Sequence, residues 1–271
     1  MARVKYKWRI AGFIFKAICS LFIAAVMILL FWRIIDNYTD TEKMNTVIPN
    51  EKLCEAYERE DGKLSPFTQE QTKYTRGEKN SGYFAVTQSL FIPEADQLQF
   101  VFRYNNSTLK YTKRDYNLAE EPSRDEDVYD VTVLIMYDLT PDNKNDNDGK
   151  TPDAVRYERF YASDMISDQK TLYNYRKFVF DGIKLTDDVI GVYVDLYYKG
   201  DVNYDETPYG SLLLYYNGDK NIPKALTSAD KSAIENWTKS QNNKNELNDR
   251  SAHFYCYFTE QYSRIPTSPR L

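Results

Sequence analysis

An apolar run from Ile10 to Trp32 constrains this 271-residue chain more than any other feature, because the only charge within its 23 residues is Lys16. A helix rises about 1.5 Å per residue, so a helix of that length can cross a hydrocarbon layer of about 30 Å. Trp8 and Trp32 would lie about 36 Å apart on it, which suits the two interfacial layers of a bilayer. We therefore predict a single transmembrane helix within residues 10–35.

The charges that flank this run predict its direction. Residues 1–9 contain no acid and four basic residues, namely Arg3, Lys5, Lys7 and Arg9. Basic flanks stay in the cytosol, so we expect residues 1–9 to be a cytoplasmic tail and the C-terminal part to lie outside the cell membrane. The alternative is a signal peptide cleaved near Ala24 and Ala25. The apolar run continues beyond those alanines to Trp32, which favours a retained signal-anchor.

The part of the chain after the run is acidic. All 40 acidic residues lie at or beyond Asp36, whereas six of the 35 basic residues precede it, which leaves a net charge of −11. Such a surface repels phosphate backbones, so nucleic acid is not an expected partner.

Three cysteines are too few for a disulfide scaffold or a structural zinc site. Cys19 lies in the apolar run, which leaves Cys54 and Cys256 in a compartment that permits oxidation. A disulfide between them would join the two ends of the outer part. Two unpaired thiols remain the alternative, because sequence alone does not give the separation of the two residues.

Periodicity divides the outer part into three regions. Residues 36–82 are polar and are expected to form a stalk, with a weak helical pattern at 51–60 and the option of folding back on the domain. From Tyr83 to Tyr262 apolar residues alternate with polar ones, as in strands with one buried face. Residues 263–271 are expected to be a C-terminal tail. Eight strands are predicted, at residues 83–92, 98–104, 131–137, 156–161, 175–180, 190–198, 212–216 and 252–258.

The chain lacks the helices that parallel strands need as crossovers, which favours antiparallel pairing. One helix is predicted after Pro223, where Thr227 and Asp230 have the spacing of a capping box. We therefore expect a transmembrane helix followed by a mainly-β antiparallel sandwich, Ig-like or jelly-roll-like, with one short appended helix.

The single histidine, His253, makes most catalytic classes unattractive. Catalytic triads, zinc hydrolases and most general-base mechanisms at neutral pH use a well-supported imidazole. Glycoside hydrolysis by two carboxylates needs no histidine, so it stays open as an enzymatic alternative. We predict no catalytic residue and no required cofactor.

The segment 142–149 is the stretch most similar to a metal ligand set, because oxygen-bearing side chains alternate before a glycine. Asp142, Asp146 and Asp148 are its candidate calcium ligands. The EF-hand pattern fails, since Val155 occupies the position of the bidentate glutamate. A solvated loop between two strands is the favoured interpretation.

The strand at 190–198 supplies the candidate binding residues. Its apolar residues alternate with Tyr193, Asp195 and Tyr197, which are predicted to share the opposite face. Two aromatic rings with a carboxylate between them can stack on a sugar and accept its hydroxyl hydrogen bonds. Ordinary cross-strand tyrosine packing is the alternative.

These observations favour a non-enzymatic, membrane-anchored protein that binds an envelope or matrix glycan, or a partner membrane protein, outside the cell. A membrane-anchored carbohydrate-active enzyme with a carboxylate pair is one alternative. A structural subunit of an envelope membrane complex is the other.

Overall fold

The computed structural model describes residues 2–69, 84–124, 126–139, 155–201 and 208–243. Its helices and strands, in chain order, are α1 (Ala2–Tyr38), α2 (Glu42–Asn45), α3 (Glu51–Arg59), β1 (Phe67–Gln69), β2 (Phe84–Ile92), the 3-10 turn η1 (Pro93–Ala95), β3 (Gln97–Asn105), α4 (Asn106–Asp115), β4 (Tyr129–Asp138), β5 (Val155–Tyr161), β6 (Asp164–Gln169), β7 (Tyr173–Asp181), β8 (Val189–Tyr198), β9 (Gly210–Tyr216) and β10 (Asn221–Pro223). A further helix covers residues 228–243.

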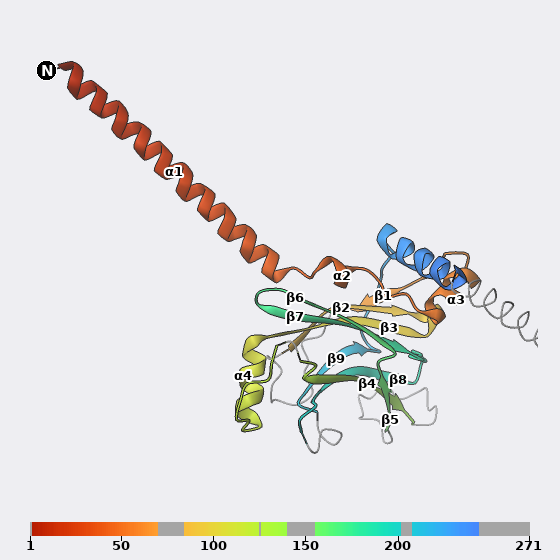
Figure 1. Ribbon diagram of the computed structural model, residues 1–271. Coiled ribbons are helices and arrows are strands. Elements are labelled where there is room, and N and C mark those ends of the chain that lie inside the picture. Colours follow the sequence, from red (N-terminus) through yellow and green to blue (C-terminus); the bar gives the residue numbers. More distant parts are fainter. Residues whose placement is uncertain (1, 70–83, 125, 140–154, 202–207, 244–271) are drawn as a thin grey trace, which may run out of the picture.

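All strands pair in the antiparallel sense and form two sheets (Figure 1). Sheet A has the order β10-β1-β2-β3-β7-β6, and sheet B has the order β5-β4-β8-β9. The mainly-β character and the antiparallel pairing are thus confirmed, and seven of the eight predicted strands are present. The eighth, at residues 252–258, lies outside the described residues, as does His253.

One hydrophobic cluster joins the facing sides of the two sheets. Sheet A contributes the Phe100 and Phe180 rings, which stack with centroids 5.3 Å apart, and sheet B contributes Val133, Val194 and Tyr129 among others. Alternation along each strand places these side chains on one face, so burial of that face aligns the two layers. At one end α4 closes the core, where the Thr112 hydroxyl lies 2.6 Å from the Tyr129 hydroxyl.

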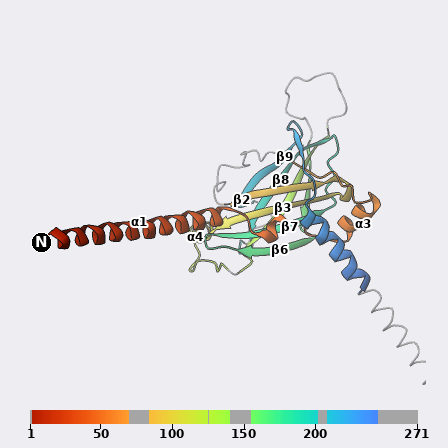
Figure 2. The ribbon, with the colours of Figure 1, turned by 90° about the horizontal axis from the view of Figure 1, so that it is seen from above.

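The other face of sheet A is covered by the segment that was predicted to be a stalk. Met44, Leu53 and Ala56 are almost fully buried. They pack with Val101 of β3 and Ile234 of the 228–243 helix in two smaller clusters. Residues 39–60 therefore fold back on the sheet, and β1 begins the sheet well before residue 83. Figure 2 shows α1 leaving one end of sheet A and the 228–243 helix lying at the opposite end.

The helix after Pro223 is confirmed together with its cap. The Thr227 N–H donates to Asp230 Oδ2 at 2.8 Å, and the Asp230 N–H donates to Thr227 Oγ1 at 3.1 Å. Asp230 Oδ1 also accepts the Val47 N–H at 2.8 Å, so one buried carboxylate caps the helix and holds the folded-back segment. Cys54 is buried beside this helix, and burial raises the pKa of its thiol. Cys256 lies outside the described residues, so their pairing stays a prediction.

Helix α1 contains the apolar run. The span from Phe13 to Ile35 has a mean hydropathy of 2.6, and none of it is buried against the rest of the protein. By length and composition this helix is a candidate for a membrane anchor or for a signal sequence.

Candidate functional site

The predicted binding residues lie on the outer face of sheet B, the face opposite the shared core. Residues directly opposite each other in neighbouring antiparallel strands point to the same side. Asp195 of β8 pairs with Thr132 of β4 and with Ser211 of β9, and Tyr193 pairs with Leu134. The alternation that placed Tyr193, Asp195 and Tyr197 on one face is therefore present in the sheet.

Burial separates these three residues. Tyr193 is half-buried, whereas Asp195 and Tyr197 are each only 2% exposed. The ring of Tyr197 therefore has no free face on which a sugar could stack, and of the three predicted residues Tyr193 alone offers accessible surface. A direct binding role for the three residues stays a prediction.

Asp195 and Tyr197 are held by polar neighbours from the strands on either side. The Ser211 hydroxyl donates to Asp195 Oδ1, and Arg159 Nη2 of β5 donates to the Tyr197 hydroxyl at 2.9 Å. Partial burial lowers the pKa of Arg159, but the nearby Tyr197, Tyr161 and Asp195 outweigh this effect and raise it. The cluster therefore keeps a firmly protonated guanidinium above a buried carboxylate.

Two further tyrosines extend this face toward the edge of the sheet. Tyr157 and Tyr161 on β5 pair with Met136 and Thr132, and their side chains are 48% and 67% exposed. We name the set Tyr157, Arg159, Tyr161 and Tyr193 the aromatic face. The sequence contained a signal for it, because Tyr157, Arg159 and Tyr161 alternate along a predicted strand, but only the pairing of β5 with β4 brings them beside β8.

No family model, curated protein or solved structure matches this chain. Functional assignment therefore depends on the site geometry itself.

The residues proposed for calcium lie outside the described residues, since 142–149 fall within the gap between β4 and β5. Within the part of the chain that the structure describes, no group of three or more histidine, cysteine or acidic residues is arranged to hold a metal ion. The calcium site at Asp142, Asp146 and Asp148 stays a prediction.

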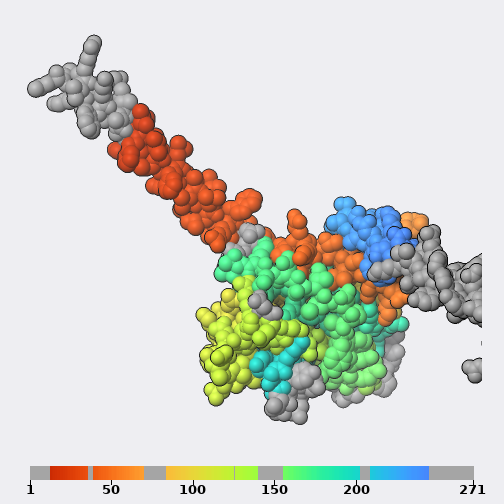
Figure 3. Space-filling model, in the orientation of Figure 1, coloured from red at the N-terminus to blue at the C-terminus, as the bar shows by residue number. Residues whose placement is uncertain are grey.

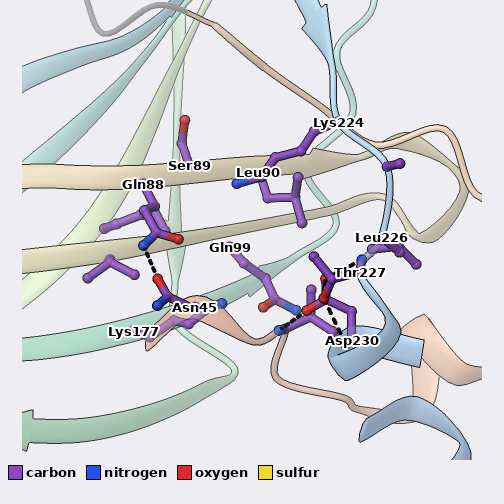
Figure 4. Close-up of a pocket in the computed structure, with 14 residues that line it drawn as sticks. Asn45, Gln88, Ser89, Leu90, Gln99, Lys177, Lys224, Leu226, Thr227 and Asp230 are labelled. Atoms are coloured by element: carbon purple, nitrogen blue, oxygen red, sulfur yellow. Dashed lines mark hydrogen bonds between the residues drawn. The ribbon is translucent and has the colours of Figure 1, made fainter. Parts of the chain in front are cut away.

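A small cavity lies where the folded-back segment meets sheet A (Figure 4). Its volume is about 40 Å³, which suits little more than one water molecule. Lys177, Gln99 and Asp230 line it. Lys177 Nζ donates to the carbonyls of Met44 at 3.2 Å and Thr46 at 2.6 Å. These residues fasten the segment to the sheet, and the space between them is too small for an organic ligand.

A larger cavity, of about 350 Å³, opens at the end of the core near β1. The Phe67 ring stacks on Phe91 with centroids 5.3 Å apart, and Tyr215 meets Phe91 edge-on at 5.6 Å. Asp96 and Lys184 line the same cavity and form an ion pair of 3.3 Å. This volume and mixed lining are within the range of small-molecule sites, so the cavity is a second concave candidate.

Proposed function

We propose that this protein is a single-pass membrane protein with a cytoplasmic N-terminus, whose extracytoplasmic two-sheet domain binds a glycan or the exposed part of another membrane protein. The observation that carries the proposal is α1, a helix whose apolar side chains have no partner surface in the described protein. Leaving more than a dozen large apolar side chains in water costs on the order of tens of kcal/mol. A lipid environment removes that cost.

The junction between α1 and the domain supports retention of the helix. Lys170 Nζ donates to the Thr39 carbonyl at 2.8 Å, and Asp40 Oδ2 accepts from Thr87 at 2.8 Å and from Gln88 at 2.7 Å. The chain that leaves the apolar span is thus held against sheet A, an arrangement that suits a domain kept at the membrane. A domain on such an anchor acts at high effective concentration, so weak contacts are sufficient for binding.

The aromatic face is the surface we propose for the contact, with Asp195 beneath it. Tyrosine rings offer a large apolar face and a polar tip, and a guanidinium offers several hydrogen-bond donors, both common in sugar and protein recognition. The shared core supports an Ig-like or jelly-roll-like sandwich as the scaffold. The carbohydrate-active enzyme and the structural subunit remain alternatives that no specific observation favours.

The anchor is tested by alkaline carbonate extraction of membranes and by sequencing the mature N-terminus. We expect the protein to stay in the membrane fraction and to retain residues 10–35. Protease added to intact cells should digest the domain. A mature chain that begins after Trp32, or a domain protected in intact cells, would contradict the proposal.

The contact face is tested by comparing the wild type with a Tyr157→Ala, Tyr161→Ala double variant on a panel of envelope glycans and by crosslinking to membrane partners. Tyr111→Ala, an exposed tyrosine on α4, is the matched control. We expect the double variant to lose binding that the control retains. Equal binding by both variants, with folding intact by circular dichroism, would exclude this face.

A further inference from the structure

A polar cavity of about 390 Å³ lies beside the hairpin formed by β6 and β7. We name it the hairpin cavity. Arg176 and Asn174 of β7 line it from the same side of sheet A as the core residues Phe178 and Phe180, because every second residue of a strand shares a face. Arg124 lines it from the connection that leads to β4. The cavity therefore lies next to the apolar core, on the same face of β7.

Arg124 brings a positive charge that neutral oxygens hold in place. Its Nε donates to Asn174 Oδ1 at 3.0 Å, and its Nη1 donates to the Thr171 carbonyl at 3.2 Å. Its Nη2 donates to the carbonyls of Lys170 and Tyr173. Among the described residues every partner of Arg124 is neutral, so its charge is oriented without being cancelled.

Asn174 has a donor that the protein leaves unused. The residue is only 5% exposed, and its Oδ1 is occupied by Arg124. Its Nδ2 is buried, and it has no hydrogen-bond partner among the described residues. Leaving such a donor unpaired is costly, and an acceptor oxygen entering the cavity could remove that cost after a small side-chain adjustment.

The acidic groups near the cavity differ in how their charge is met. Asp127 forms an ion pair with Arg176 and a second one with Lys199. Asp168 also lines the cavity, and its Oδ1 accepts the Gln169 N–H at 2.9 Å, a neutral partner that leaves its negative charge in place. An oxyanion is therefore favoured at the side of the cavity formed by Arg124 and the Asn174 amide, which both offer hydrogen-bond donors.

The cavity lies close to the end of the apolar helix. Lys170 connects the two, because its carbonyl accepts from Arg124 and its Nζ donates to the Thr39 carbonyl at 2.8 Å. Thr39 follows Ile35, the last residue of the apolar span, by four residues, or about 6 Å of helix rise. Polar headgroups occupy a layer of about that depth on each side of the hydrocarbon. Figure 3 shows the surface of the β6–β7 hairpin directly beside the end of α1.

We propose that the hairpin cavity binds a phosphate group, and that its source is the headgroup of an anionic membrane lipid. The inference rests on the proposed membrane anchor for the lipid source, whereas the phosphate chemistry rests on Arg124 and Asn174 alone. A bound headgroup fixes the orientation of the domain on the bilayer, because the site and the anchor are joined through Thr39.

The test measures binding to the full-length protein in mild detergent. The probes are soluble dihexanoyl-phosphatidylglycerol, dihexanoyl-phosphatidylcholine and inorganic phosphate. We expect phosphatidylglycerol to bind most tightly. Asn174→Asp keeps the acceptor for Arg124 but places a carboxylate in the cavity, and Arg124→Gln removes the cation. Each change should weaken phosphatidylglycerol binding about tenfold or more, as expected for loss of a charged hydrogen bond.

Lys184→Gln, in the cavity near β1, is the matched control and should bind as the wild type does. Asn174→Asp and Arg124→Gln must retain the wild-type near-ultraviolet circular dichroism, and Arg124→Lys should recover part of the binding. Unchanged affinity in the Asn174→Asp and Arg124→Gln variants, or no binding by any probe, overturns the inference.

Inorganic phosphate that binds as tightly as phosphatidylglycerol overturns the lipid source. Carbonate extraction tests the anchor separately: an extractable protein that still binds phosphatidylglycerol through Arg124 would refute the proposed anchor and leave the phosphate site standing.

Discussion

The side chain of Gln99 pairs with both backbone groups of Ile48. Its Oε1 accepts the Ile48 N–H at 2.9 Å, and its Nε2 donates to the Ile48 carbonyl at 2.8 Å. The glutamine therefore satisfies the same two groups that a neighbouring strand would satisfy. Through this contact a polar face of β3 becomes an interior surface, and Gln99 is only 1% exposed.

We predict that Gln99→Ala lowers the free energy of unfolding by about 2–4 kcal/mol, because it leaves the N–H and carbonyl of Ile48 buried without partners. Urea denaturation in detergent, followed by circular dichroism, measures this change. Gln169→Ala, at an exposed position on β6, is the control and should shift stability by less than about 0.5 kcal/mol. Equal shifts in both variants would show that Gln99 does not hold the folded-back segment.

The buried Lys177 predicts a pH dependence of stability. Burial is the main cause that lowers the pKa of Lys177 from 10.5 to about 8, with a further lowering by Lys224, while Asp230 and Asp40 oppose it. Between those two pH values the unfolded chain keeps a proton that the native protein has lost. The contribution of Lys177 to stability therefore rises with pH across this window.

Comparison of the wild type with Lys177→Met isolates this effect, because the variant lacks the titrating group but shares every other one. We expect the difference in unfolding free energy, wild type minus variant, to increase by about 1 kcal/mol per pH unit above pH about 8. Urea denaturation at several pH values measures it. A difference that stays constant or falls as the pH rises would contradict the prediction.

Tyr193 and Tyr197 should respond differently to truncation although they share one face. Tyr197→Ala removes a ring that is 2% exposed together with its bond to Arg159, and should cost about 3 kcal/mol or more of stability. Tyr193 is half-buried, so Tyr193→Ala should cost about 1 kcal/mol. Thermal unfolding measures both changes. Equal losses would mean that the two rings are packed alike.

A side chain at Gly210 is predicted to destabilise the protein. A Cβ there would collide with the ring of Phe84, which is buried in the core. We expect Gly210→Ala to destabilise the protein by about 1–3 kcal/mol. At Gly218 a Cβ would meet the ring of Tyr216 at 2.6 Å, but that ring is 46% exposed and can move aside. Gly218→Ala should therefore have the smaller effect in the same urea titration.

Local patterns in the sequence were sufficient for seven strands but not for β1, β6 and β10. The seven matched strands have seven to ten residues each, long enough for a period of two to show in the sequence. β1 and β10 have three residues each, too few to show a period, and β6 has no buried residue that would mark a face. α4 was missed because its turns are polar, although Asn105 and Thr108 form a capping box that was open to recognition.

The candidate site was predictable in part for the same reason. The strand pattern placed Tyr193, Asp195 and Tyr197 on one face, but burial depends on neighbours that are distant in the chain. Arg159 covers Tyr197, and Ser211 holds Asp195. Neither neighbour could be paired with β8 before the strand order was known.

The sequence alone determined the apolar helix, the antiparallel β character and the cap at Thr227, because each depends on residues a few positions apart. The tertiary structure decided that residues 39–60 cover sheet A and that the hairpin cavity gathers Arg124 and Asn174. Those outcomes depend on hydrogen bonds and burial between segments about 50 or more residues apart, as between Ile48 and Gln99 or Arg124 and Asn174. Local sequence patterns do not predict contacts between segments so far apart. Such contacts stabilise the fold only when both partners are already in place.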